Sequence, residues 1–129
     1  MNKQILITGV IFGLISIVLG AFAAHGLKES LSPNSLQSFE VGVKYQMYHA
    51  LFLLFLGQFN SLSKTTKRVI YIFITSGIIL FSFSIYGLST QVITGINFKP
   101  IGFITPIGGL LLIIGWILLL RAILKIKTI

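Results

Sequence analysis

Five polar side chains beside the apolar runs of this sequence are its best candidates for acid–base or ligand chemistry: His25, Lys28, Gln46, His49 and Tyr86. An imidazole changes charge near neutral pH, which suits it to proton transfer. Gln46 and His49 are three residues apart, a spacing that places both on one face of a helix. Polar groups inside a membrane usually mark a site with partners. These residues therefore form a candidate polar rim for a small ligand, a lipid headgroup or a proton.

Other interpretations of the histidines stay open at this point. His25 could simply bond the free carbonyls of a helix end, while His49 and Gln46 link neighbouring helices. Two imidazoles could also bind a haem iron axially, whereas zinc needs at least three protein ligands. The sequence has two histidines and no cysteine, and it shows no Ser-His-acid set and no glycine-rich phosphate loop. We expect no catalytic residue, no metal and no cofactor.

The helices that carry these residues are expected in a membrane, because the chain is too poor in charge for a soluble domain. It is 55% hydrophobic and 9% charged, with a mean hydropathy of +0.99, whereas a soluble domain has about 25% charged residues. The net charge of +8 could suggest nucleic acid. However, the basic residues are spread between apolar runs instead of gathering on one face. We expect no nucleic-acid partner.

Four apolar runs predict four membrane crossings, at about residues 5–24, 44–61, 69–89 and 101–120. A helix needs ~20 residues to cross the ~30 Å hydrocarbon core, and these runs lack the alternation of barrel strands. Ser32 followed by Pro33 predicts the start of a short interfacial helix before the second crossing. The predicted fold is all-α: an integral membrane four-helix bundle, with residues 1–129 in a single domain.

The distribution of lysine and arginine predicts the orientation of the bundle. Segments on the cytoplasmic side of a membrane are enriched in these residues. Most of them lie in the N-terminal tail, the second connector and the C-terminal tail: Lys3, Lys64, Lys67, Arg68, Arg121, Lys125 and Lys127. We therefore expect both termini in the cytoplasm, and a location in the cell membrane of a bacterium.

The first run has one face of small residues, which includes Gly9, Gly13 and Gly20. Such faces let membrane helices approach each other closely. The stretch Ala-Phe-Ala at residues 21–23 would also permit cleavage of a signal peptide. A discarded peptide needs no packing face, so we expect this helix to be retained.

The fourth run carries two further packing candidates, Gly108 and Gly115, seven residues apart on one stripe. Pro100 fits the first position of a helix. Pro106 is expected about one turn further in, where a proline removes a backbone hydrogen bond. It therefore predicts a kink, either static or acting as a hinge that gates the polar rim.

Four motifs, in order along nearly the whole chain, resemble the transmembrane-protein-256-like family. They are "GAFAAHGLK" ending the first helix, "YQMYHAL" opening the second, "FSFSIYGLS" ending the third and "TPIGGLLLIIGW" in the fourth. The resemblance implies a small four-helix membrane protein with a retained first helix. It implies no established biochemistry, since the family is built on a domain of unknown function.

The sequence favours a structural, lipid-binding or partner-binding component of the membrane over an enzyme. Membrane lipids, a second copy of the chain or another membrane protein are the partners expected. The alternative is a small-solute or proton-coupled transporter. Such a transporter would act as an oligomer, because four short helices leave little room for a pathway within one bundle.

Overall fold

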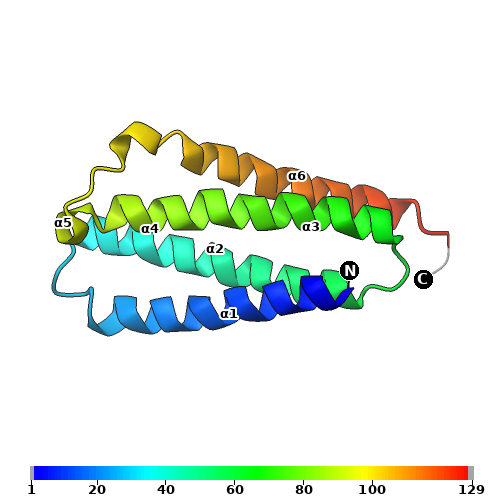
Figure 1. Ribbon diagram of the computed structural model, residues 1–129, viewed down its shortest axis with the longest axis horizontal. Coiled ribbons are helices and arrows are strands. Elements are labelled where there is room, and N and C mark those ends of the chain that lie inside the picture. The colour runs from blue at the N-terminus through cyan, green and yellow to red at the C-terminus, as the bar shows by residue number, and fades with distance from the viewer. Residues whose placement is uncertain (1, 128–129) are drawn as a thin grey trace.

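The computed structural model describes residues 2–127 and is helical along most of that length. The elements are α1 (Asn2–His25), α2 (Pro33–Gln58), α3 (Lys64–Ile78), η1 (Ile79–Phe83), α4 (Ser84–Ser89), α5 (Gln91–Thr94), η2 (Lys99–Ile101) and α6 (Ile104–Leu124). In Figure 1 the long rods lie side by side and alternate in direction, with α3, η1 and α4 continuous as one rod. The η1 element is a single π-helical turn inside that rod.

Two serines set where the inner rods begin. The Ser32 hydroxyl accepts from the Ser35 backbone N–H at 3.2 Å, with Pro33 in the first position of α2. The Ser63 hydroxyl accepts from the Thr66 N–H at 3.1 Å at the start of α3. Each bond satisfies a donor that the first helical turn leaves free. These caps fix where the first and second connectors end, and neighbouring rods are antiparallel (Figure 1).

The short interfacial helix expected before the second crossing is not a separate element. Residues 33–58 form one unbroken helix, because after Pro33 in its first position no further proline and no glycine-rich stretch interrupts it. As a consequence, Gln46 and His49 lie near the middle of α2. They do not lie at its outer end, where the sequence-based rim placed them.

The fourth rod also begins later than its apolar run. Pro100 belongs to the 3-10 turn η2, and α6 starts at Ile104. Pro106 is therefore in the first turn of α6, where its missing N–H would have had no partner within the helix. The kink or hinge predicted at Pro106 has no basis in this geometry.

Glycines mark the closest contacts between rods. A methyl group on Gly9 would lie 3.0 Å from the Ala50 carbonyl oxygen on α2. A methyl group on Gly108 would collide with the backbone of η1, and one on Gly115 with the Ile74 side chain of α3. Gly13 and Gly20 leave more space, with the nearest α2 atoms at 3.8 and 3.5 Å. The bundle thus consists of an α1–α2 pair and an α3–α6 pair, joined where α2 packs along the third rod of α3, η1 and α4.

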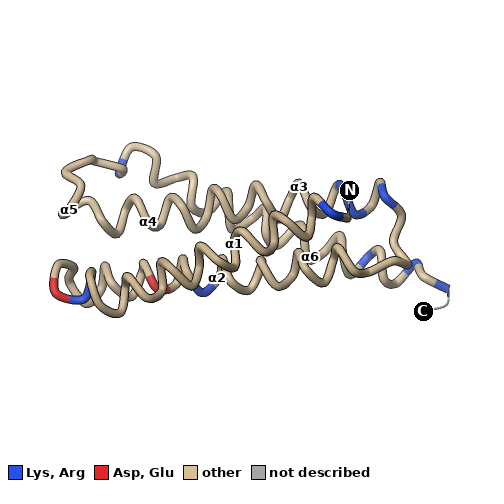
Figure 2. The backbone as a smooth tube through the Cα atoms, turned by 60° about the horizontal axis from the view of Figure 1, so that its bottom comes forward, with Lys and Arg blue, Asp and Glu red and all other residues tan. Residues whose placement is uncertain are grey.

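The outer surface of these rods is apolar over most of its length. Three rods are long and apolar enough to cross a membrane: Asn2–His25, Lys64–Ser89 and Lys99–Leu124. Large side chains such as Leu14, Ile17 and Ile113 point away from the core, which would be unfavourable in water. Figure 2 shows most of the lysines and arginines near the end that holds both termini, and both glutamates in the opposite half of the bundle. The prediction of several apolar helices long enough to cross a membrane is confirmed for the described residues.

Candidate functional site

Gln46 is the centre of a polar cluster inside the bundle. Its side chain is fully buried at 0% exposure. The Nε2 group donates to the Phe12 carbonyl of α1 at 2.9 Å, and Oε1 accepts from the Tyr86 hydroxyl of α4 at 2.6 Å. One amide therefore ties three rods together. In an apolar interior each of these bonds is expensive to break, because the freed group has no water to replace its partner.

A row of serines continues this cluster. Ser16 donates back to the Phe12 carbonyl at 2.8 Å, and Ser82 in η1 donates to the Gly42 carbonyl of α2, also at 2.8 Å. Gly42 has no side chain because Tyr86 occupies the space: an added methyl would meet the Tyr86 ring at 2.8 Å. Ser82 and Tyr86 thus hold α2 against the third rod from two successive turns.

The π-helical turn is closed by Ser84. A π turn breaks the regular ladder of backbone bonds, and the carbonyls that it frees need other donors. The Ser84 hydroxyl lies 2.5 Å from the Leu80 carbonyl oxygen and 2.9 Å from that of Phe81. Because its single proton points to these carbonyls, Thr105 Oγ1 on α6, 2.6 Å away, donates to Ser84. This hydroxyl pair joins the third rod to the start of α6.

His49 is bound through both ring nitrogens. Nδ1 lies 2.6 Å from the Tyr45 carbonyl oxygen, and Nε2 accepts from the indole N–H of Trp116 at 3.0 Å. A carbonyl can only accept and an indole can only donate, so the ring is the neutral form with its proton on Nδ1. A doubly protonated imidazole would set an N–H against the Trp116 N–H. This arrangement holds α2 to α6 and leaves no nitrogen for a metal or haem.

A shallow lateral groove of about 360 Å³ opens beside this pair. Its walls are mostly aromatic and aliphatic, with Gly109 where α6 approaches η1; the lining residues are Tyr45, His49, Phe81, Gly109, Leu112, Ile113 and Trp116. Both imidazole nitrogens are already used, so the groove offers mainly apolar contact.

The structure brings only part of the predicted rim together: Gln46 and Tyr86 are hydrogen-bonded, whereas His25 and His49 lie apart. Gly20 on α1 faces Val43 on α2, and His49 lies six residues from Val43, about 9 Å along the helix at ~1.5 Å per residue. His25 lies five residues from Gly20 in the opposite direction, a further ~7 Å. The imidazoles are therefore about 16 Å apart along the bundle and share no pocket. His25 and Lys28 are exposed, and within residues 2–127 neither side chain makes a hydrogen bond.

A buried lysine was missed by the sequence analysis. Lys67 is 2% exposed, and its ammonium donates to Asn2 Oδ1 at 3.1 Å and to the Gly57 carbonyl at 3.4 Å. Lys67 belongs to α3, but its ammonium group lies at the C-terminal end of α2, where the helix dipole favours a cation. A signal was present in the sequence, because Lys67, Ile70 and Ile74 are spaced as one stripe of the third rod. From the distribution of basic residues, Lys67 was predicted only to be one of the charges on the cytoplasmic side.

Comparison with known proteins places this chain in a family. Residues 19–109 match the family described as "Protein of unknown function (DUF423)". The chain belongs to this family. Its relatives include a UPF0382 membrane protein of Staphylococcus aureus, 42% identical over 95% of this chain and 97% of the relative. The UPF0382 membrane protein YwdK of Bacillus subtilis is 39% identical over 95% of this chain and 98% of the relative. No solved structure matches the chain.

The DUF423 match spans much of the buried polar cluster. Residues 19–109 include Gln46, His49, Tyr86 and Thr105, whereas Phe12 and Trp116 lie outside them. The relatives cover nearly the whole chain, so they extend over both of those partners. This DUF423 chain is thus a membrane protein with several apolar helices and a domain of unknown function.

Proposed function

We propose that this DUF423 chain is a structural component of the bacterial cell membrane, a four-crossing bundle with both termini in the cytoplasm. The observation that supports the structural role is the hydrogen bonding of its buried polar groups. Within residues 2–127 the Thr75 hydroxyl is buried without a hydrogen-bond partner. The other buried polar and charged side chains have partners in the protein: Ser16, Gln46, His49, Lys67, Ser82, Ser84 and Ser89. Several of these bonds join different rods, and the bonded groups are not free to bind a moving solute.

The fourth crossing in this proposal is α2, the least apolar of the long rods. Its 26 residues span about 39 Å at ~1.5 Å per residue, which exceeds the ~30 Å hydrocarbon core. Its polar residues Gln46 and His49 face inward and each has its own hydrogen-bond partners, while Leu51 and Phe55 face outward. Polar groups of membrane helices normally face the bundle interior in this way.

The orientation follows from the charges at the two ends of the bundle. The end that holds both termini also holds the start of α3, with Lys64 and Arg68, and the end of α6, with Arg121 and the C-cap residue Lys125. The opposite half of the bundle carries both glutamates and fewer basic residues. The excess of Lys and Arg favours the first end as cytoplasmic. The likeness to the transmembrane-protein-256-like family agrees with four crossings and remains a prediction.

Single-cysteine labelling in intact cells tests both the crossing of α2 and the orientation. The natural chain has no cysteine, so Ser30→Cys and Ser61→Cys, at exposed positions in the connectors before and after α2, give clean reporters. With a membrane-impermeant maleimide we expect labelling at position 30 and none at position 61 until the cells are opened. Equal labelling of both would remove the α2 crossing, and the reverse pattern would invert the orientation.

A flux assay tests the structural role itself. Full-length protein in liposomes that contain a pH-sensitive dye should leave an imposed pH gradient as stable as in empty liposomes. His49→Ala should lower stability without changing this baseline. A proton flux that is lost in a folded His49→Ala protein would instead establish the transporter alternative.

A further inference from the structure

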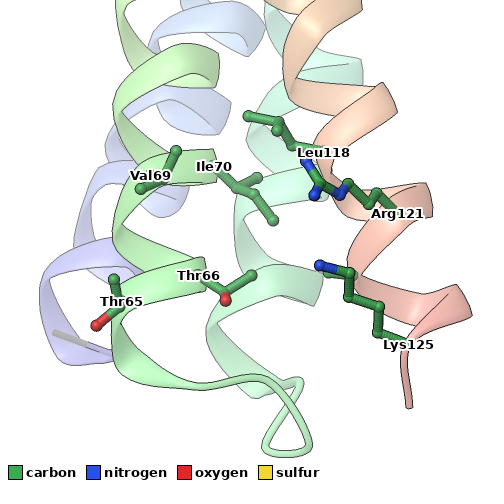
Figure 3. A pocket seen from close by; sticks show the side chains of 8 residues that line it. Thr65, Thr66, Val69, Ile70, Leu118, Arg121 and Lys125 are labelled. Atoms are coloured by element: carbon green, nitrogen blue, oxygen red, sulfur yellow. The ribbon is translucent and has the colours of Figure 1, made fainter.

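A second groove lies between α3 and α6, at the end of the bundle that holds the termini (Figure 3). It has a volume of about 290 Å³. Arg121 and Lys125 extend from α6 toward α3, and Thr65 and Thr66 line the facing wall. The two cations are four residues apart, which places them on the same face of α6.

The positive charge of this groove has no counterion among the side chains of the protein. The chain has only two carboxylate side chains, Glu29 and Glu40, and both lie in the opposite half of the bundle (Figure 2). Like charges four residues apart on a helix repel each other. An external anion bound between them would remove this repulsion.

The facing wall can supply a hydroxyl donor. Thr66 Oγ1 accepts a hydrogen bond from the Ser63 hydroxyl at 2.9 Å, so its own proton is left to donate elsewhere. Threonine hydroxyls together with arginine and lysine are typical phosphate-binding side chains.

The groove is also amphipathic along its length. Val69, Ile70 and Leu118 form its wall toward the middle of the bundle, while Lys125 and Thr65 lie toward the end. In a membrane-spanning bundle this gradient follows the boundary between headgroups and acyl chains. A soluble anion would use only the charged end, whereas a phospholipid would use both.

We propose that this groove binds one anionic glycerophospholipid of the leaflet at the terminal end of the bundle. Its phosphate lies between Arg121 and Lys125 with Thr66 as a further donor, and one acyl chain follows Val69 and Leu118. Basic pockets between membrane helices on the cytoplasmic side are suited to such headgroups. This inference rests on the proposed membrane-spanning bundle and names a ligand for it.

The test is native mass spectrometry of the full-length protein with equal amounts of phosphatidylglycerol and phosphatidylcholine of identical acyl chains. The wild type should retain phosphatidylglycerol in preference. Removing a cation near an anionic lipid surface lowers affinity about fivefold, so Arg121→Gln/Lys125→Gln should lower it about 30-fold.

Lys64→Gln/Arg68→Gln is a matched control, because it removes the same charge from the same end and neither residue lines the groove. We expect it to lower the affinity less than the groove variant does, because neither residue can contact a phosphate bound in the groove. Equal losses in the two double variants would overturn the site, because diffuse charge would then explain the binding. A wild type without preference for phosphatidylglycerol would overturn the ligand.

Two further measurements distinguish a lipid site from a soluble-anion site and lost binding from lost folding. Inorganic phosphate at millimolar concentration should not displace phosphatidylglycerol; displacement would show a soluble-anion site instead of a lipid site. Far-UV circular dichroism of both double variants should match the wild type, so that lost binding reflects the groove. The cysteine-labelling and flux experiments do not involve the groove residues, so the structural role and the lipid site can fail independently.

Discussion

Replacing Gly108 with alanine should weaken the bundle, whereas the same replacement at neighbouring Gly109 should not. At position 108 the new methyl would lie 2.7 Å from the Leu80 carbonyl carbon and 2.8 Å from Phe81 Cα. These are backbone atoms of the π turn, which cannot rotate aside. At position 109 the nearest atoms belong to the Phe81 ring, at 3.5 Å, which is an ordinary van der Waals distance.

The expected magnitude follows from how far α6 would have to move. Carbon atoms pack at about 3.5–4.0 Å, so a methyl at position 108 forces α6 and η1 apart by about 1 Å. Overpacking of this kind costs about 1–3 kcal/mol. Exchanging glycine for alanine inside a helix returns about 1 kcal/mol at either position. This gain cancels between the two variants, so Gly108→Ala should be about 1–3 kcal/mol less stable than Gly109→Ala.

Unfolding in mixed micelles by added SDS can measure this difference. The chain has a single tryptophan, Trp116, whose indole bonds His49 across the α2–α6 contact. Its fluorescence should therefore report separation of these two rods. Gly109→Ala is expected to unfold at the same SDS fraction as the wild type or a higher one, and Gly108→Ala at a lower one. Equal midpoints for the two variants would refute the close approach of α6 to the π turn.

Three further predictions concern the buried polar groups. Gln46→Leu and Tyr86→Phe should each cost about 1–3 kcal/mol of unfolding free energy, because each leaves a buried partner unpaired; the double variant should cost less than the sum, and strict additivity would contradict the bond. Nitrogen-15 NMR should show that His49 is neutral and protonated at Nδ1. Trp116→Phe should lower the unfolding free energy by about 1 kcal/mol, because it removes the hydrogen bond to His49. A ring protonated at Nε2 would exclude this His49–Trp116 hydrogen bond. Thr75 Oγ1 is buried without a hydrogen-bond partner among the described residues, so Thr75→Val should raise the unfolding free energy by about 1 kcal/mol, and a loss of that size would reveal an unseen partner.

The long helices were predictable because their signals are local. Apolar runs of about 20 residues mark the rods, and the Ser32 cap followed by Pro33 marks the start of α2. The position at which a continuous helix enters the hydrocarbon core has no such local signal. The sequence therefore suggested an interfacial helix before residue 44, although residues 33–58 fold as one rod.

The polar pairs were not predictable, because they join residues far apart in the chain. His49 and Trp116 are 67 residues apart, and Gln46 and Tyr86 are 40 apart. The apolar composition indicated that these polar groups needed hydrogen-bond partners. Which residues are the partners depends on which rods are neighbours. The π turn adds a further difficulty, since it rotates every later residue of the third rod relative to a regular helix. The predicted rim of His25, Lys28 and His49 did not form because α2 begins at Pro33, which places His49 near the middle of that rod.

The pairing of α1 with α2 has a consequence for biosynthesis. A ribosome completes α1 before α2, so the Phe12 carbonyl is in place when Gln46 leaves the tunnel. The Tyr86 hydroxyl, the other partner of Gln46, arrives only after another 40 residues. In the proposed four-crossing bundle, the least apolar rod therefore enters the bilayer when the acceptor for its buried Gln46 amide is already present. Order of synthesis and order of assembly coincide, and a chain with α1 moved to the C-terminus should insert α2 poorly.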